Sequence, residues 1–170
     1  MLPYIFLILQ LAFAIFFFYL CLAFITGAPF VPSTNQVSES MILLAHIKKG
    51  MIVCDMGSGN GKLLMHASHL GAKTVGFEIN PFLVLFSNAR AFFSPYRKMM
   101  HTYWKNYWQA DISHVDVIFI YLLPWKMEKL EQKLIGECKK GTIIVSNSFI
   151  FPHLTNIRMD KKHHVFAFRI

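Results

Sequence analysis

The N-terminal part of the chain is hydrophobic and has no polar face. From Tyr4 to Thr26 there is no charged residue, and Gln10 is the only strongly polar side chain in this run of 23 residues. A helix needs roughly 20 apolar residues to cross the hydrocarbon core of a bilayer. A cleavable signal peptide would have a basic start and a shorter apolar run. A helix buried in a protein core is the other alternative. The pattern favours a transmembrane anchor over residues 1–26, with the bilayer as its partner.

After the anchor, short apolar runs alternate with segments of helical periodicity. Strands are predicted for the apolar runs at residues 51–55, 74–78, 102–104, 115–121, 142–146 and 165–170. Helices are predicted from about Ser38 to a stop at Gly50, and over residues 62–70, 80–93 and 127–138. Such alternation is typical of a parallel sheet with crossover helices, and a closing antiparallel strand pair fits residues 156–170. The predicted fold class is α/β, a Rossmann-like doubly wound sheet preceded by a transmembrane helix.

This pattern divides the chain into three parts. The anchor takes residues 1–26, a turn-rich linker takes residues 27–37, and one domain takes residues 38–170. The last part holds about 130 residues, a normal size for a single domain. The sequence therefore predicts one compact domain tethered at its N-terminal end.

Charge is distributed unevenly along the chain. All 17 Lys and Arg lie after residue 47, and the formal net charge is +8. The positive-inside tendency places the domain of a single-pass protein on the cytoplasmic or mitochondrial matrix side. A basic face could also lie against anionic headgroups, or simply be solvated. Basic and aromatic residues mix between residues 96 and 108, but no long basic tract follows, so we expect no nucleic-acid partner.

The cysteines give no metal-binding pattern. Cys21, Cys54 and Cys138 are far apart, and no Cys-x-x-Cys or Cys/His spacing of a zinc site is present. We therefore predict no metal site.

The segment Asp55-Met-Gly57-Ser-Gly59-Asn-Gly61 lies where a predicted strand meets a helix. Glycines let the backbone turn sharply and approach a ligand closely. Ligands bind at the carboxyl ends of strands in such sheets. Glu78 ends the second predicted strand, 17 residues after Gly61. An acidic side chain there can accept hydrogen bonds from both ribose hydroxyls of a nucleotide. A tight structural turn is the alternative for the glycines alone.

The spacing of this glycine loop distinguishes between two classes of nucleotide. A dinucleotide site has the spacing G-x-G-x-x-G and places a pyrophosphate on the helix N-terminus. Here the spacing is G-x-G-x-G, with Asp55 two positions before the first glycine. S-adenosylmethionine (AdoMet) has no phosphate but carries an ammonium and a sulfonium group, which a carboxylate attracts. AdoMet is the predicted cofactor, and a non-catalytic nucleotide-binding module is the alternative from a different class.

Four segments in chain order resemble one family of class I methyltransferases: residues 27–33, 55–61, 76–84 and 121–124. The family contains the mitochondrial protein-lysine methyltransferases that act on the ATP synthase c-subunit and the adenine nucleotide translocase, together with prokaryotic relatives. The resemblance covers residues 27–170. It implies a seven-stranded sheet, mostly parallel with an antiparallel last strand. It also implies AdoMet-dependent methylation of lysine in a membrane-associated protein.

The same resemblance implies the cofactor-binding residues. The glycine loop would hold the methionine part of AdoMet, Glu78 the ribose, and Pro32 with its neighbours would close over the cofactor. Asn106 lies where family members often have an acidic residue, and it can still accept from the adenine amino group. The complete predicted set is Asp55, Gly57, Ser58, Gly59, Gly61, Glu78, Asn80, Asn106 and Pro32.

Methyl transfer to lysine requires an aligned and deprotonated amine. The reference pKa of lysine is about 10.4, and desolvation in a pocket lowers it. No base is identifiable from spacing. Tyr121, at the end of the predicted fourth strand, is the candidate for lining the acceptor slot, and a packed aromatic residue is the alternative. The predicted function is protein-lysine N-methylation, and a lipid, a quinone or another small membrane molecule is the alternative acceptor.

Overall fold

The structure, a computed structural model, describes residues 2–26 and 33–170. Its centre is a seven-stranded sheet with the order β3-β2-β1-β4-β5-β7-β6. The strands are β1 (Ile52–Met56), β2 (Lys73–Glu78), β3 (Met100–Trp104), β4 (Val117–Ile120), β5 (Ile143–Asn147), β6 (Asn156–Asp160) and β7 (Val165–Arg169). Strands β1 to β5 pair in parallel, and β7 pairs antiparallel with both β5 and β6. The predicted mostly parallel sheet with a closing antiparallel pair is confirmed.

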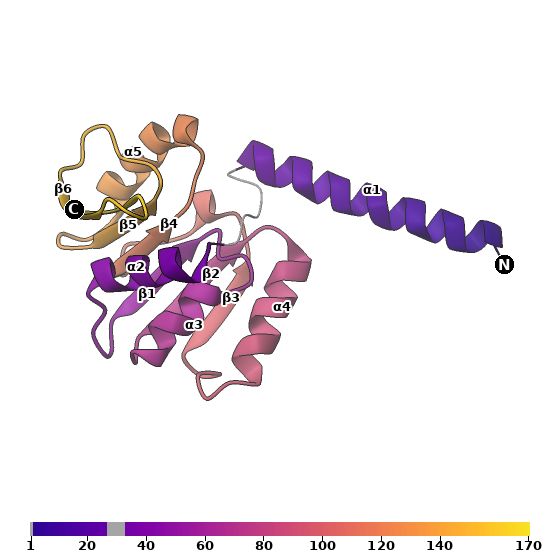
Figure 1. The fold of residues 1–170 in the computed structure, drawn as a ribbon, viewed down its shortest axis with the longest axis horizontal. Coiled ribbons are helices and arrows are strands. Elements are labelled where there is room, and N and C mark those ends of the chain that lie inside the picture. Colours follow the sequence, from indigo (N-terminus) through magenta and orange to yellow (C-terminus); the bar gives the residue numbers. More distant parts are fainter. Residues whose placement is uncertain (1, 27–32) are drawn as a thin grey trace.

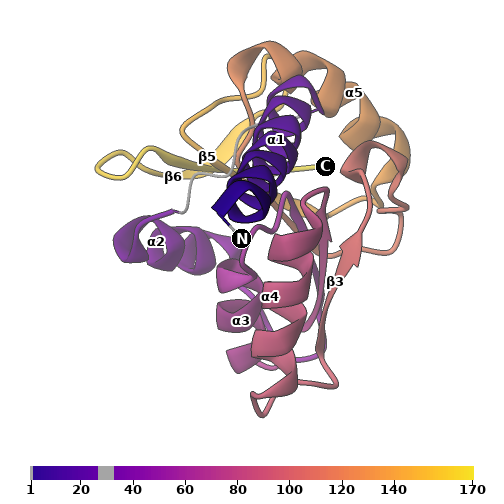
Figure 2. The same cartoon turned by 90° about the vertical axis from the view of Figure 1, so that its right-hand side faces the viewer.

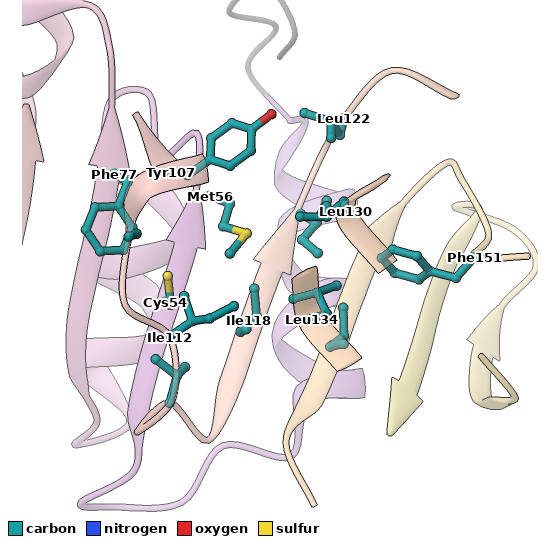
Figure 3. Close-up of a cluster of buried hydrophobic side chains, with 14 of the residues drawn as sticks. Cys54, Met56, Phe77, Tyr107, Ile112, Ile118, Leu122, Leu130, Leu134 and Phe151 are labelled. Atoms are coloured by element: carbon teal, nitrogen blue, oxygen red, sulfur yellow. The ribbon is translucent and has the colours of Figure 1, made fainter. Parts of the chain in front are cut away.

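Helices cover both faces of the sheet, as a doubly wound fold requires. They are α2 (Asn35–Ala45), α3 (Lys62–His69), α4 (Pro81–Phe92) and α5 (Met127–Glu137), with short 3-10 turns η1 (Tyr107–Gln109) and η2 (Pro124–Lys126). On one face, α2 and α3 bury an apolar cluster that includes Met41, Leu63 and Phe119. Helix α4 lies beside α3 (Figures 1 and 2). On the other face, α5 packs Leu130 and Leu134 onto the sheet (Figure 3).

Helix α2 begins and ends at different residues from those predicted. It begins at Asn35 because Thr34 is its N-cap, with a side-chain oxygen that accepts from the Val37 backbone N–H at 3.3 Å. It ends at Ala45 because His46 adopts a left-handed conformation, with φ of 49°. Gly50 therefore does not stop this helix but lies in the turn before β1. Sequence periodicity marked the apolar face of α2 but not its caps.

Helix α1 (Leu2–Thr26) precedes the sheet domain and extends away from it (Figure 1). Its side chains include exposed apolar residues such as Phe6, Phe13 and Phe17. Among residues 2–26 and 33–170, however, no helix combines the length and apolarity needed to span a bilayer. The predicted transmembrane anchor, with its bilayer partner and its single-pass membrane location, is wrong for the part of the chain that the structure describes.

Candidate functional site

The glycine loop connects β1 to α3 at the carboxyl end of the central strand. Gly57, Gly59 and Gly61 have φ of 95°, 52° and 73°. These angles lie in the left-handed region that side chains with a Cβ disfavour. At Gly61 there is also no room, because a Cβ would collide with the side chains of Ser87 and Met100. The glycine loop is thus a tight turn from β1 to α3, at the strand–helix junction where the sequence placed it.

The loop lies directly on β2. The backbone N–H groups of Gly57 and Ser58 both donate to the carbonyl oxygen of Phe77, at 2.9 Å and 3.1 Å. The Ser58 side chain points against Gly76, where an added Cβ would collide with its hydroxyl and approach Leu64 to 2.7 Å. Gly76 is therefore the residue that lets loop and strand approach each other. Ser58 is buried, and its hydroxyl oxygen has no hydrogen-bond partner among the described residues, so its cofactor contact stays a prediction.

Glu78 joins the end of β2 to the glycine loop. One carboxylate oxygen accepts from the backbone N–H of Gly59 at 2.9 Å, and the other accepts from Ile79 and Asn80, both at 2.9 Å. Only 8% of the residue is exposed. Three N–H donors hold the carboxylate in one orientation at the strand end, where the ribose contact is predicted.

Asp55 lies on β1 between β2 and β4, paired with Gly76 on one side and Phe119 on the other. Burial, and then the nearby charge of Glu78, raises the pKa of Asp55 to about 7. Burial also raises the pKa of Glu78, although its three backbone hydrogen bonds oppose that shift. Two buried carboxyl groups that disfavour each other's ionisation make a site that a cation stabilises. The ammonium and sulfonium charges of AdoMet fit this requirement, whereas a pyrophosphate does not.

The two predicted asparagines cap the helix and the 3-10 turn that follow neighbouring strands. The Asn80 side-chain oxygen accepts from the Phe82 N–H at 3.0 Å and caps α4. The Asn106 side-chain oxygen accepts from the Trp108 N–H at 3.1 Å and caps η1. Both residues follow the carboxyl ends of β2 and β3, so they lie on the predicted side of the sheet. Pro32 is outside the described residues.

Tyr121 directly follows β4 and is half-buried. The strand-end position predicted for it is confirmed. Because β1 and β2 carry the glycine loop, Asp55 and Glu78, Tyr121 lies on the other side of the central strand. We call the carboxyl ends of β1 and β2, with the residues predicted to bind the cofactor, the cofactor half of the candidate site, and the edge beside Tyr121, the residue predicted to line the acceptor slot, the acceptor half.

Two basic side chains that sequence reasoning missed also fix the glycine loop. Arg90 of α4 donates to the Asn60 carbonyl oxygen at 3.0 Å. Lys62, the first residue of α3, donates to the Ser33 carbonyl oxygen at 2.8 Å. Both bonds join side chains to backbone oxygens 29 or 30 positions away. No local sequence pattern marks contacts of this kind.

Within the described residues, no three His, Cys, Asp or Glu side chains lie together in a way that could hold a metal ion.

Comparison with known proteins agrees with this architecture. The sequence profile of the ANTKMT methyltransferase domain matches residues 55–158, from Asp55 to the middle of β6. The chain belongs to the ANTKMT methyltransferase family. Among its relatives, the ATP synthase c-subunit lysine N-methyltransferase of Rattus norvegicus is 32% identical over 127 residues, covering 75% of this chain and 58% of the rat protein. A protein-lysine N-methyltransferase of Saccharolobus islandicus is 29% identical, covering 75% of this chain and 81% of its own length.

Solved structures give the same picture of the family's fold. An RNA methyltransferase from Salinibacter ruber, in complex with S-adenosylhomocysteine (AdoHcy), superposes with a TM-score of 0.79 at 30% identity. The match covers 82% of this chain and 94% of that one. A second methyltransferase, from Thiobacillus denitrificans, shares the fold at 17% identity, with a TM-score of 0.60. The chain spans little more than half the length of the rat relative. Similarity to that protein alone therefore does not establish the activity or the methyl acceptor of this chain.

Proposed function

We propose that this chain is an AdoMet-dependent protein-lysine N-methyltransferase. The observation that carries the proposal is the pair of buried carboxyl groups, Asp55 and Glu78, on either side of a loop that only glycines can form. A cationic ligand favours the ionised form of both groups, whose pKa values burial raises. Family membership supports a methyl donor as that ligand.

In this proposal Asp55 and the glycine loop hold the methionine part of the cofactor. The Glu78 carboxylate keeps its three backbone donors and uses its one remaining lone-pair site, on the oxygen that accepts from Gly59, for a ribose hydroxyl. Asn80 and Asn106 line the same sheet edge, and each side-chain oxygen has a second lone pair beyond its capping bond. When bound, AdoMet supplies a methyl group already activated by its sulfonium.

Lysine is the proposed acceptor because relatives of two kinds are named lysine N-methyltransferases. The rat protein is a lysine methyltransferase of the ATP synthase c-subunit, and a mouse relative, 27% identical, is one of adenine nucleotide translocase. The Saccharolobus protein, which this chain matches over most of its length, is also named for protein lysine. The acceptor half beside Tyr121 is where the amine would enter.

Two measurements test the proposal on the full chain. Calorimetry with AdoHcy should show binding by the wild type and a clear loss of affinity in Glu78→Gln. Glu128→Gln, an exposed position on α5, is the matched control and should bind like the wild type. No AdoHcy binding by the wild type would refute the cofactor and favour a non-catalytic module.

The acceptor is tested with methyl-labelled AdoMet and two purified proteins in detergent, the ATP synthase c-subunit and adenine nucleotide translocase. We expect label in methyl-lysine after acid hydrolysis of one of them. A parallel incubation with total membranes and total RNA should leave the lipid and RNA fractions unlabelled. Label confined to the lipid phase or to RNA would refute lysine as the acceptor while leaving the cofactor site intact.

A further inference from the structure

The loop after β5, residues 148–155, is held by hydrogen bonds to a buried glutamate on α5. Glu131 of α5 is only 1% exposed. One oxygen of its carboxylate accepts from the backbone N–H groups of His153 and Leu154, at 2.9 Å and 2.7 Å. The other oxygen lies 2.8 Å from Nδ1 of His153. An acidic side chain from the helix that follows β4 thereby determines the course of the loop that follows β5.

The loop has two further anchors. Ser146, at the end of β5, donates its hydroxyl hydrogen to the Phe149 carbonyl oxygen at 2.7 Å. The Phe151 ring is buried in the apolar cluster that also contains Leu122 and Leu130 (Figure 3). It meets Phe168 edge-on, with ring centroids 5.1 Å apart. The backbone around residue 153 is therefore held rigidly, although the His153 side chain is itself 74% exposed.

The hydrogen bonds determine which nitrogen of His153 is available. An ionised carboxylate can only accept, so Nδ1 must carry the hydrogen that it shares with Glu131. The second nitrogen, Nε2, then has the lone pair and belongs to the exposed side of the ring. A carboxylate on Nδ1 orients an imidazole and stabilises the imidazolium that forms when Nε2 takes a proton. A buried glutamate placed in this way costs desolvation energy, which three hydrogen bonds offset.

The position of the pair matches the acceptor half of the site. The cofactor half uses the carboxyl ends of β1 and β2. Tyr121 follows the carboxyl end of β4, and His153 follows that of the neighbouring strand β5. Leu122, next to Tyr121, shares its apolar cluster with Phe151 of the His153 loop. Tyr121 and the loop of His153 thus follow the carboxyl ends of two adjacent strands.

Glu131 is the charged side chain that hydrogen-bonds to this imidazole. Residues 148–155 contain no titratable side chain besides His153. On α5, Glu128 lies about one turn before Glu131 and Lys129 two residues before it, and both are exposed to solvent. The sheet residues beneath Phe151 are apolar.

We propose that His153 is the proton acceptor for the substrate lysine and that Glu131 is its positioning residue. This inference rests on the proposed lysine methylation. Nε2 of His153 takes a proton from the lysine ammonium group, which leaves a neutral amine and an imidazolium paired with Glu131. The amine nitrogen then bonds to the methyl carbon as the C–S bond of the sulfonium breaks, and that electron pair stays on sulfur. The imidazolium returns its proton to solvent through the exposed edge of the ring.

The test compares pH–rate profiles of methyl transfer for the full chain and three variants, using whichever of the two candidate substrates, the c-subunit or the translocase, the wild type labels. The wild-type rate should reach a plateau once His153 is deprotonated. His153→Gln should be about 100-fold slower near neutral pH, the lower end of the effect of a general base. Its rate should rise about tenfold per pH unit, because only spontaneously deprotonated lysine then reacts. Glu131→Gln should lower kcat with little change in KM for the protein substrate, because the amide no longer offers acceptors to both Nδ1 of His153 and the loop backbone.

The matched control is a second histidine–carboxylate pair. Nδ1 of His163 lies 2.7 Å from Asp160, which also accepts from Ser40 of α2 on the opposite face of the sheet. His163→Gln should leave the pH–rate profile unchanged. AdoHcy affinity should be the same in all four proteins, and melting temperatures identify any variant that fails to fold.

Two outcomes overturn the inference. If His153→Gln folds, binds AdoHcy and retains the wild-type plateau, His153 is not the proton acceptor, whereas the proposed function stands. If the wild type labels neither protein at lysine, the proposed function fails and this inference fails with it.

Discussion

The carboxylate of Glu78 and the backbone N–H of Gly59 are 2.9 Å apart, so the middle of the glycine loop is hydrogen-bonded to the end of the neighbouring strand β2. The two residues are 19 positions apart in the chain. The glycine loop and Glu78, the acid proposed to bind the ribose, are therefore one structural unit rather than two separate contacts.

This relationship predicts the effect of Glu78→Gln. An amide replaces one acceptor oxygen by an NH₂ group, which must then face a backbone N–H of Gly59, Ile79 or Asn80. Hydrogen bonds to charged groups contribute about 1.5–3 kcal/mol. We expect calorimetry to show AdoHcy affinity about 10- to 100-fold weaker. An unchanged dissociation constant would mean that Glu78 supports neither the loop nor the ligand.

The raised pKa of Asp55 predicts pH-dependent cofactor binding. In the ligand-free protein this group has a pKa of about 7, well above the ordinary value of 3.8, so it is largely protonated in mildly acidic solution. A cationic ligand needs the carboxylate and must displace that proton. AdoMet affinity should therefore rise as pH increases toward about 7 and level off above it. Asp55→Asn should bind weakly and show little pH dependence.

The raised pKa of Asp55 makes AdoMet affinity rise with pH but makes the stability of the ligand-free protein fall with pH. Between pH 3.8 and about 7 the folded state holds a proton on Asp55 that the unfolded chain releases. The contribution of this group to stability is therefore greatest in acid and is lost as pH rises toward about 7. Thermal melts of ligand-free wild type and Asp55→Asn should converge at low pH and separate near neutrality, with the variant the more stable. If the melting temperatures of wild type and Asp55→Asn differ only in acid, the raised pKa of Asp55 is contradicted.

Two glycine-to-alanine substitutions test the packing of the glycine loop. Gly61→Ala places a Cβ against Ser87 and Met100 in a left-handed backbone, so we expect a loss of about 1–3 kcal/mol in unfolding free energy. Gly136 is the control, because it lies in α5 with nothing within 4 Å of an added Cβ. Gly136→Ala should stabilise by up to about 1 kcal/mol. Equal effects of the two substitutions in denaturant titrations would contradict the structure.

Tyr121→Ala separates acceptor binding from cofactor binding. Since Tyr121 follows β4 and takes no part in the glycine loop, AdoHcy affinity should stay within about twofold of the wild type, while kcat/KM for the protein substrate falls about tenfold or more. Tyr96→Phe is the matched control. Its hydroxyl pairs with His69 at 2.6 Å, in the turn before β3 and away from the carboxyl edge of the sheet. A parallel loss of AdoHcy affinity in Tyr121→Ala would assign this residue to the cofactor half.

Much of the site follows from the sequence because its main parts are local. The glycine loop is contiguous, and the spacing of Asp55 and Glu78 follows from one strand–helix–strand unit. Gly76 was not predicted as a site residue because its role depends on the loop that lies on it. The bond between Glu131 and His153 was likewise missed, since it joins residues 22 positions apart on different elements. Helix α2 was misplaced at its ends because His46, not Gly50, adopts the left-handed conformation that terminates it.

The strand order has a consequence for how the protein is made. Strands β3, β2 and β1, together with the glycine loop, come from residues 52–104, which include Asp55 and Glu78, and neighbour one another in both sequence and space. The edge of β5 that faces away from β4 pairs with β7, which is synthesised after β6 but lies between β5 and β6 in the sheet. Domains assemble from the N-terminal side during translation, and non-local pairings form slowly. The cofactor half of a nascent chain can therefore be in place while the edge of β5 still awaits its neighbour.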